Sequence, residues 1–492
     1  MLLLVAALSM HLGATTYYVA KTGNDGNPGT EAEPWLTVGK SVKILAAGDT
    51  LWIKAGTYDE PLVNFGYNAG TAAAPIVIKG YDGWNSIVQA PIKVCRAHFI
   101  VESLKIVLDT TCGVSQAFKF DSQGGKRGDS GVIRNCELTQ TERYSHYTNG
   151  VNVGNMHGSV IDSNTIHGFG QRDATVGYGM YVEASGTTVT NNTVYDISSY
   201  GLHVYSDGRP IDSCEIAYNL IYDTHGGMIV AGSYNNIHHN IVYSSSFRGV
   251  YLWRSDGHDN EVSNNVIYNS AFFALNLAGN GAVNTVRNNI CIGAKAIATE
   301  SGNPSTFDYN CYFPANAAFW YSGSNWGLAT WQATSGQDAH SIEANPCVAD
   351  TGAHDFRLSD SSPCIDAGDP TTPPRYDIEG ITAPQDAAVD IGAYEFCQTG
   401  VKTPPESTSA KKFTIAPNPV SGGFATVRYN LPEAGSATFE VFNASGRLVR
   451  SSFVVQRSSF QIDLRSMPAG VYMVRVTSDG ASSTQKLVVA GN

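Results

Sequence analysis

The 492-residue sequence has few charged residues, and basic residues are scarcer than acidic ones. Lysine and arginine number 31, against 43 aspartates and glutamates, which gives a formal net charge of −12. This balance lacks the basic face that nucleic-acid binding requires, so we expect no nucleic-acid partner. It does not exclude an acidic polysaccharide as a partner, because the local field at the binding surface decides that attraction.

The sequence also lacks cysteines at the spacing typical of metal sites and apolar stretches long enough to span a membrane. The nine cysteines include no CxxC pair and no Cys/His cluster at zinc spacing, so we predict no zinc site. The apolar stretch Met1–Ala14 is too short to span a bilayer and no later stretch is long enough, so we predict no transmembrane segment. Residues 1–14 instead indicate a signal peptide, although they lack a basic start, and a buried first strand is the alternative.

Two short phrases repeat through the middle of the chain and predict a solenoid. The first is an asparagine followed by apolar or small residues, and the second is a glycine or alanine followed by an alternating apolar strand. Two strands per repeat of about 21–29 residues indicate stacked β-coils, because one repeat cannot bury its own apolar side chains. The first phrase begins at Asn135, Asn164, Asn192, Asn219, Asn240, Asn265, Asn289 and Asn310, and the second at Gly150, Gly179, Gly201, Gly227, Gly249 and Ala274.

Alternation within the second phrase predicts which side chains face the core. Met180, Leu202, Met228 and Val250 should point inward, and the residues between them outward. We expect the repeated asparagines at a sharp turn, where their amides stack as a ladder and have no catalytic role. Stacked coils then place the outward residues in two columns, one of Asn152, Tyr181, His203, Ile229, Tyr251 and Asn276 and one of Gly154, Glu183, Tyr205, Ala231, Trp253 and Ala278.

The N-terminal part resembles the entrance of secreted right-handed parallel β-helix proteins of the pectate-lyase-like superfamily. The segments that carry the resemblance are Tyr17–Val19, Gly23–Thr30, Pro34–Trp35, Gly48–Thr50 and Gly56–Tyr58. It implies an all-β fold with a right-handed parallel β-helix over residues 15–396 and an N-terminal capping helix. Residues 34–45 have the apolar spacing of a short amphipathic helix, which would cover the exposed core and strand edges of the first coil.

The C-terminal part differs in composition and begins after a polar linker at residues 397–412. Residues 413–492 contain PNP, SGR, LRSMPAGVY and a terminal KLVV, and they resemble the C-terminal sorting domain of the type IX secretion system. This resemblance implies a small β-sandwich of seven strands, recognition by the secretion machinery, and export across the outer membrane of a Bacteroidetes-like bacterium. The protein would be secreted or attached to the cell surface, and we expect it to be a monomer. A carbohydrate-binding sandwich is the alternative.

Aromatic and basic residues gather on the two outward columns and predict a glycan-binding face. Aromatic rings can stack on sugars, and arginine binds carboxylates in a bidentate manner. Asp207 and Asp256 lie in corresponding Asp-Gly turns and could hold Ca²⁺ with a substrate carboxylate, although ordinary turn chemistry explains them equally well. The predicted substrate-binding residues are Tyr181, Tyr205, Arg209, Arg248, Trp253 and Asn276.

The reaction remains open between elimination and hydrolysis. β-Helix lyases of this superfamily often use a lysine base, but no lysine occurs between Lys126 and Lys295, which argues against a lysine base on the central columns. We therefore hypothesise a polysaccharide lyase for acidic glycans, in which His203 or Tyr251 exchanges the proton and Arg254 binds the carboxylate. A glycoside hydrolase that uses Glu183 with Asp207 is one alternative, and a non-catalytic glycan-binding protein is another.

Overall fold

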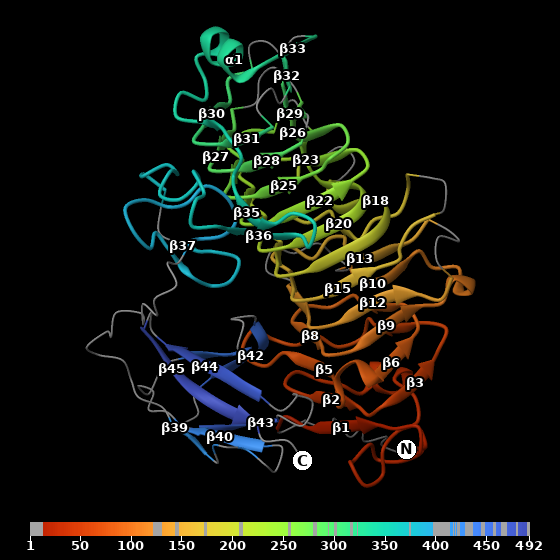
Figure 1. Ribbon diagram of the computed structural model, residues 1–492. Coiled ribbons are helices and arrows are strands. Elements are labelled where there is room, and N and C mark those ends of the chain that lie inside the picture. The colour runs from red at the N-terminus through yellow and green to blue at the C-terminus, as the bar shows by residue number, and fades with distance from the viewer. Residues whose placement is uncertain are drawn as a thin grey trace, which may run out of the picture. The chain divides into compact units, whose positions relative to one another are not determined.

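The computed structural model contains a long stack of parallel β-coils and, later in the chain, a smaller β-domain (Figure 1). Contacts divide the chain into one compact unit of residues 1–378 and 382–396 and a second unit of residues 379–381 and 397–492. The structure describes residues 13–121, 130–142, 147–171, 175–205, 210–253, 257–278, 283–293, 295–299, 303–314, 318–321, 323–372, 375–396, 414–416, 418, 420, 424–428, 436–443, 448–455, 459–463, 470–478 and 481–489.

Sheet 1 of the coil stack is formed by short parallel strands, most of them of three or four residues. Each strand pairs with the corresponding strand of the next coil, as in β14 with β17, where Ile161 lies beside Val189. The strands are β1 (Thr16–Val19), β2 (Thr50–Ile53), β5 (Ile76–Gly80), β8 (Phe99–Glu102), β11 (Gly131–Arg134), β14 (Val160–Asp162), β17 (Thr188–Thr190), β19 (Glu215–Ala217), β21 (Asn236–His238), β24 (Glu261–Ser263), β27 (Thr285–Arg287) and β30 (Thr306–Asp308).

Sheet 2 follows the asparagine turns, and it merges with sheet 3 where β18 and β20 run through both sheets. Its strands are β3 (Gly56–Asp59), β6 (Ser86–Gln89), β9 (Lys105–Leu108), β12 (Glu137–Gln140), β15 (Thr165–His167), the first part of β18 (Thr193–Val204), the first part of β20 (Leu220–Val230), β22 (Ile241–Ser245), β25 (Val266–Tyr268), β28 (Ile290–Ile292), β31 (Cys311–Phe313) and β34 (Ile342–Glu343).

Sheet 3 contains the glycine phrases, and its strands are again parallel apart from the terminal β33. The strands are β4 (Val63–Phe65), β7 (Ile92–Val94), β10 (Gln116–Phe120), β13 (Asn149–Val153), β16 (Met180–Val182), the second parts of β18 and β20, β23 (Arg248–Leu252), β26 (Phe273–Leu277), β29 (Lys295–Thr299), β32 (Ala318–Tyr321) and β33 (Ser324–Trp326).

Three strands per coil, rather than the two expected, surround the core. The strand that was missed belongs to sheet 1, where β14 and β17 each point only one side chain inward and so give no alternation to detect. The predicted inward residues of sheet 3 are confirmed, because Met180, Leu202 and Met228 are fully buried and Val250 is almost so. Large apolar side chains from all three sheets fill one continuous core.

The asparagine ladder lies at the turn from sheet 1 to sheet 2, as predicted. Asn192 shows the pattern: its Oδ1 accepts from the backbone N–H and from Nδ2 of Asn164, and its own Nδ2 donates to the carbonyl of Ile161. Each ladder asparagine follows a residue with a φ of 51–60°, which makes the sharp bend. Asn135 was wrongly assigned to the ladder, because it is the bend residue, and Cys136 holds the ladder position by donating its N–H to Asn164.

A second asparagine ladder, which we did not predict, lies at the turn that leads into sheet 1. Asn235, Asn260 and Asn284 each hydrogen-bond to the next member with side-chain distances of 2.8–3.5 Å, and Ser305 ends the series. The signal in the sequence is weak, because the series is short and lies beside the stronger repeat. Both ladders satisfy buried backbone groups that the turns would otherwise leave unpaired.

The N-terminal cap is shorter than predicted. Only Gly39–Lys43 forms a helix, the 3₁₀ helix η1, instead of residues 34–45. Trp35 forms an isolated parallel bridge with Val19, which keeps the preceding residues extended. The Glu60 carboxylate accepts from the N–H groups of Val38 and Gly39 at 2.6 and 2.7 Å and so satisfies donors at the helix start.

The far end of the coil stack is covered by helix α1 (Leu328–Ser335), which Figure 1 shows beyond β30 and β31. Trp331 of this helix is buried and donates from Nε1 to Asp338 at 2.6 Å. The chain then returns along the coils through β35 (Val348–Asp350), β36 (Asp355–Leu358), β37 (Arg375–Tyr376) and β38 (Thr382–Ala383). Within the described residues, no helix is long and apolar enough to cross a membrane.

In the second unit, the described residues form a β-sandwich of a three-stranded and a four-stranded antiparallel sheet, in agreement with the seven strands expected. The predicted linker at residues 397–412 lies outside the described residues, and so does the signal peptide except for Gly13 and Ala14. The strands are β39 (Thr414–Ala416), β40 (Phe424–Arg428), β41 (Ser436–Asn443), β42 (Leu448–Val455), β43 (Ser459–Asp463), β44 (Gly470–Ser478) and β45 (Ala481–Val489).

Candidate functional site on sheet 3

The outward side of sheet 3 carries the two predicted columns in the predicted register. Tyr181 lies beside His203, His203 beside Ile229, and Ile229 beside Tyr251. Asn152 and Asn276 extend this first column at its two ends. In the second column, backbone hydrogen bonds between neighbouring coils continue the same coil spacing beyond the strand ends. One of them runs from the Tyr205 N–H to the carbonyl of Val182.

His203 is buried among aromatic rings in the middle of this face. Its ring stacks on Tyr181 at 5.0 Å and on Tyr205 at 5.2 Å between centroids, and Tyr178 lies 4.3 Å away. Burial lowers the pKa of His203 to about 4, and its Nδ1 has no hydrogen-bond partner among the described residues. The imidazole is therefore neutral at neutral pH, but it is only 8% exposed and is a poorly accessible base.

Tyr200 joins this aromatic group to Arg248. Its ring centroid lies 6.1 Å from that of His203, and the positive charge of Arg248 acts on its hydroxyl. Gly226 makes room for it, because a Cβ at that position would lie 2.3 Å from the Tyr200 ring. Burial raises the pKa of Tyr200, and the Arg248 contact opposes that rise.

A pocket of about 480 Å³ opens farther along the same face. Two cations flank it: the Arg248 guanidinium lies 4.4 Å from the Tyr251 ring and 5.4 Å from the Phe272 ring, and the Lys295 ammonium lies 4.8 Å from Phe272. Both cations thus contact the Phe272 ring. The other lining residues include the aromatic Phe273 and Trp320 and the amides of Asn276 and Asn325. A pocket of this composition suits a ligand that has both a ring and a negative charge.

The Tyr251 hydroxyl is protonated at neutral pH. Burial raises the pKa of Tyr251, and the neighbouring Arg248 opposes that rise without reversing it. A protonated phenol beside the Arg248 cation can donate a proton to a leaving oxygen. Arg248 Nε is buried without a hydrogen-bond partner among the described residues, so it retains donor capacity.

Lysines extend the first column beyond its N-terminal end, outside the central columns on which no lysine base was expected. Lys119 lies beside Asn152, and Lys93 lies beside Lys119. Both ammonium groups contact Asp121 Oδ2, at 3.1 Å from Lys93 and 3.3 Å from Lys119. The prediction did not include these lysines, because the predicted column began at Asn152, whereas β7 and β10 continue it through two earlier coils.

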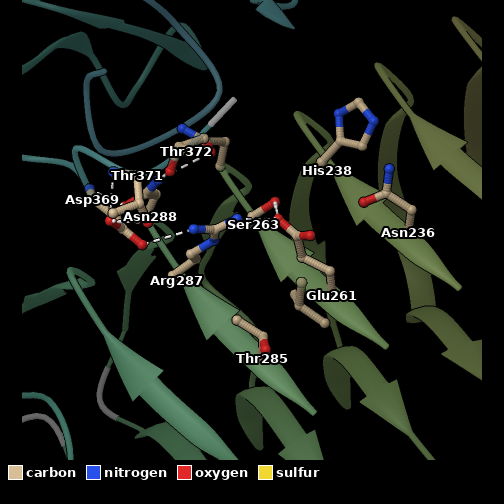
Figure 2. Close-up of polar contacts among 12 residues, drawn as sticks. Asn236, His238, Glu261, Ser263, Thr285, Arg287, Asn288, Asp369, Thr371 and Thr372 are labelled. Atoms are coloured by element: carbon tan, nitrogen blue, oxygen red, sulfur yellow. Dashed lines mark hydrogen bonds and ion pairs between the residues drawn. The ribbon is translucent and has the colours of Figure 1, made fainter. Parts of the chain in front are cut away.

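A different polar network lies on the outward side of sheet 1, where Figure 2 shows Arg287 between Glu261 and Asp369. Its guanidinium contacts Glu261 at 3.0 Å and Asp369 at 2.7 Å. Burial would raise the pKa of Glu261, but the Arg287 hydrogen bond lowers it overall. The adjacent Asn288 binds Thr372 at 3.0 Å. This network therefore fastens the returning segment onto the coils.

The predicted site residues fall into three groups. Arg248, Tyr251 and Asn276 line the pocket. Tyr181, Glu183, His203, Tyr205 and Trp253 lie on the same face but are not among the pocket-lining residues. Glu183 accepts from Asn152 Nδ2 at 3.2 Å, and Trp253 packs edge-on to Tyr205 at 4.8 Å. The remaining four, Asp207, Arg209, Arg254 and Asp256, lie outside the described residues.

Calcium stays a prediction, because both residues proposed to bind it lie outside the described part of the chain. Among the described residues, no three histidine, cysteine, aspartate or glutamate side chains are grouped so that they could hold a metal ion. The eight described cysteines are all free thiols.

Sequence reasoning missed Lys295, Phe272, Trp320 and Asn325 in the pocket. Lys295 begins β29, one coil beyond the last glycine or alanine phrase that was recognised, and Trp320 and Asn325 follow the end of the repeat. Extending the column by one more coil would have placed Ala298 beside Asn276 and indicated the neighbouring Lys295.

Comparisons with known proteins agree with this architecture. Residues 178–328 match the right handed beta helix region family, and residues 414–490 match the secretion system C-terminal sorting domain. The chain thus carries a right-handed β-helix and a type IX sorting domain, which marks it as a secreted or cell-surface protein of the Bacteroidetes type. The match to the sorting domain also implies recognition by the secretion machinery.

Individual relatives resemble the chain only distantly. YwoF of Bacillus subtilis, described as uncharacterized, is 24% identical over 435 residues, which cover 70% of this chain and 91% of that protein. Pectate lyase PEL9 of Emericella nidulans is 34% identical over 85 residues, only 17% of this chain and 20% of the lyase. The crystal structure of pectate lyase Pel9A superimposes with a TM-score of 0.54 at 15% identity, over 78% of this chain and 96% of that one. This structural likeness shows the fold.

Proposed function

We propose that the β-helix binds an acidic polysaccharide along the outward face of sheet 3 and cleaves it by β-elimination in the pocket. The observation that carries the proposal is the pairing of Arg248 and Lys295 around one aromatic ring, beside Tyr251. In the described residues neither cation forms a salt bridge with a carboxylate, so both are available to an anionic ligand. The short sequence match to a pectate lyase supports a uronate substrate.

Each pocket residue has a role in this proposal. Arg248 clamps the uronate carboxylate and stabilises the negative charge that develops when the neighbouring proton leaves. Lys295 first releases a proton to water, and its neutral amine then accepts the proton from the sugar carbon and becomes an ammonium again. Tyr251, whose raised pKa keeps it protonated, donates to the leaving glycosidic oxygen. The aromatic rings and the Asn276 amide orient the sugar, and the Arg254 predicted from the sequence would add a second clamp.

His203 is a weaker candidate for the base than the sequence suggested. Its burial and the stacked rings of Tyr181 and Tyr205 limit its contact with a sugar. Its place in the aromatic stack favours a role in holding Tyr181 and Tyr205 in position. The hydrolytic alternative needs Glu183 with Asp207, and Glu183 is engaged by Asn152.

A panel of purified glycans, read in two ways, tests the proposal. Polygalacturonate, alginate, a glycosaminoglycan and a neutral xylan are incubated with the protein, and the ultraviolet absorbance of unsaturated uronate is followed together with reducing ends. Both signals indicate a lyase, reducing ends alone indicate a hydrolase, and binding with neither signal indicates a glycan-binding protein.

Variants then assign the residues on whichever polymer is cleaved. We expect Arg248→Gln, Lys295→Gln and Tyr251→Phe to lose turnover, while Glu183→Gln retains it and His203→Ala keeps most of it. Loss of turnover in Glu183→Gln alone, with the three pocket variants active, would replace elimination by hydrolysis.

A further inference from the structure

We infer that Lys93 and Lys119 form a second anion-binding subsite, far from the pocket on the same face of sheet 3. Their role would be to hold a carboxylate of a distant sugar in the same polysaccharide chain. This inference rests on the proposed function, because it takes the substrate to be a long anionic polymer.

The first observation is a positive charge that the cluster does not neutralise. Lys93 and Lys119 are direct neighbours on parallel strands, where like charges repel. Asp121 lies between them and contacts both ammonium groups through the same oxygen, Oδ2. Burial opposes the charge on Lys93, yet the hydrogen bond to Asp121 raises its pKa overall, so the lysine stays charged. Two cations with one carboxylate leave one net positive charge among the described groups.

The second observation is that the cluster is open to a ligand. The side chains of Lys93 and Lys119 are about one third exposed, at 33% and 29%. Gly154 follows Asp121 in the second column, and a Cβ there would lie 3.3 Å from Asp121 Oδ1 and 3.7 Å from the Lys119 side chain. A glycine at this position therefore places no side chain of its own against Asp121 and Lys119.

The third observation is alignment with the pocket. The first column runs from Lys93 and Lys119 through Asn152, Tyr181, His203 and Ile229 to Tyr251 at the pocket. Lys119 and Tyr251 are separated by five steps of the coil stack, or about 24 Å along its axis. A linear polymer laid along the column can contact both ends, whereas an oligosaccharide in the pocket that is too short to span this distance cannot. Recognition of the substrate would thus depend on its length.

The test compares a long and a short ligand. Binding of polygalacturonate and of its trimer, and of alginate and its trimer, is measured by isothermal titration calorimetry on the full chain at low salt. We expect Lys119→Gln and Lys93→Gln to weaken polymer binding about tenfold each, as the loss of one charge-assisted contact implies, and to leave trimer binding unchanged. Arg248→Gln should weaken both. Added salt should reduce polymer affinity more in the wild type than in Lys119→Gln.

Two further variants separate the subsite from general effects of charge or folding. Gly154→Val keeps both lysines but covers the cluster, and should also weaken polymer binding only. Lys105→Gln removes an equally exposed lysine, at 29%, from sheet 2, and should change neither affinity. Equal affinity of the wild type, Lys119→Gln and Gly154→Val for a polymer that the wild type binds would overturn this inference alone. A wild type that binds neither these two polymers nor the glycosaminoglycan of the panel would overturn the proposed function and this inference together.

Discussion

Sheet 1 and the pocket end of sheet 3 present similar outward columns but treat their charges in opposite ways. On sheet 1 the cations are paired with carboxylates: Glu102 binds Lys79 and Arg134, and Arg287 lies between Glu261 and Asp369. On sheet 3, within the described residues, Arg248 and Lys295 contact aromatic faces instead. Each of these sheet 1 cations has a carboxylate partner, and at the other end of sheet 3 Lys93 and Lys119 share Asp121. The two pocket cations have no such partner among the described residues and leave positive charge for a ligand.

This difference shows how one repeated backbone can provide both a docking face and a binding face. A coil sets the position and direction of each outward side chain, and neighbouring coils decide whether that side chain meets an opposite charge. Sheet 1 uses the ion pairs to hold the returning segment, as the contact between Arg287 and Asp369 shows. The pocket on sheet 3 keeps Arg248 and Lys295 beside rings, where a desolvated anion would gain most.

The largest expected effect comes from removing both pocket cations. Arg248→Gln with Lys295→Gln should weaken binding of the cleaved polymer by about 4 kcal/mol, roughly a thousandfold, because two charge-assisted contacts are lost. Titration calorimetry and thermal unfolding of the same preparation measure affinity and folding separately. Unchanged affinity in a folded double variant would show that the pocket is not the binding site, and that the comparison between the two sheets has no functional meaning.

Acidification should reduce the stability contributed by His203 on sheet 3 and by Glu261 on sheet 1 in different pH ranges. The pKa of His203 is lowered to about 4 from 6.5, so the unfolded chain binds a proton that the folded chain excludes, and stability falls as pH drops from about 6.5 to about 4. The Glu261 pKa is lowered, so its contribution is lost only at more acidic pH, as the pH falls through that lowered value. The free energy of unfolding, measured with urea at pH 7 and at pH 4, should fall by about 3 kcal/mol less for His203→Phe than for the wild type. If the difference in unfolding free energy between the two proteins does not change with pH, His203 is not buried as a neutral imidazole.

Breaking the sheet 1 network should reduce stability without affecting binding. Arg287→Gln leaves Glu261 and Asp369 without their cation, and the Arg287 side chain is only 15% exposed, so we expect a loss of about 2 kcal/mol in unfolding free energy. Chemical denaturation gives the stability, and glycan titration serves as the control. Weaker glycan binding in this variant at full folding would mean that the two faces are coupled.

The smallest effect is expected on sheet 2, where Lys105 pairs with Glu137 at 2.9 Å. The lysine is partly exposed, so Lys105→Gln should change the unfolding free energy by no more than about 0.5 kcal/mol. Denaturation midpoints of Lys105→Gln and Arg287→Gln, measured under the same conditions, compare how much each ion pair stabilises the protein. A loss as large as that of Arg287→Gln would show that outward ion pairs stabilise the coils generally.

The sequence by itself determined the repeat, the register and the direction of each side chain on sheet 3. These properties are local: alternation has a period of two along a strand, and equivalent residues of parallel coils must stack. The column from Asn152 to Asn276 and the inward Met180 and Leu202 followed from this rule alone. The C-terminal sorting domain could also be recognised from the sequence, because it has its own short motifs.

Only the tertiary structure decided which outward residues are accessible and which charges are paired. His203 was predicted to be a reactive surface histidine, yet rings from its own and neighbouring strands enclose it. Lys295 enters the pocket from one coil past the last recognised glycine or alanine phrase, and Trp320 from past the end of the repeat. Asp121 joins two lysines from different coils. Burial and electrostatic pairing depend on groups far apart in the chain, and a periodic pattern does not specify which of them meet.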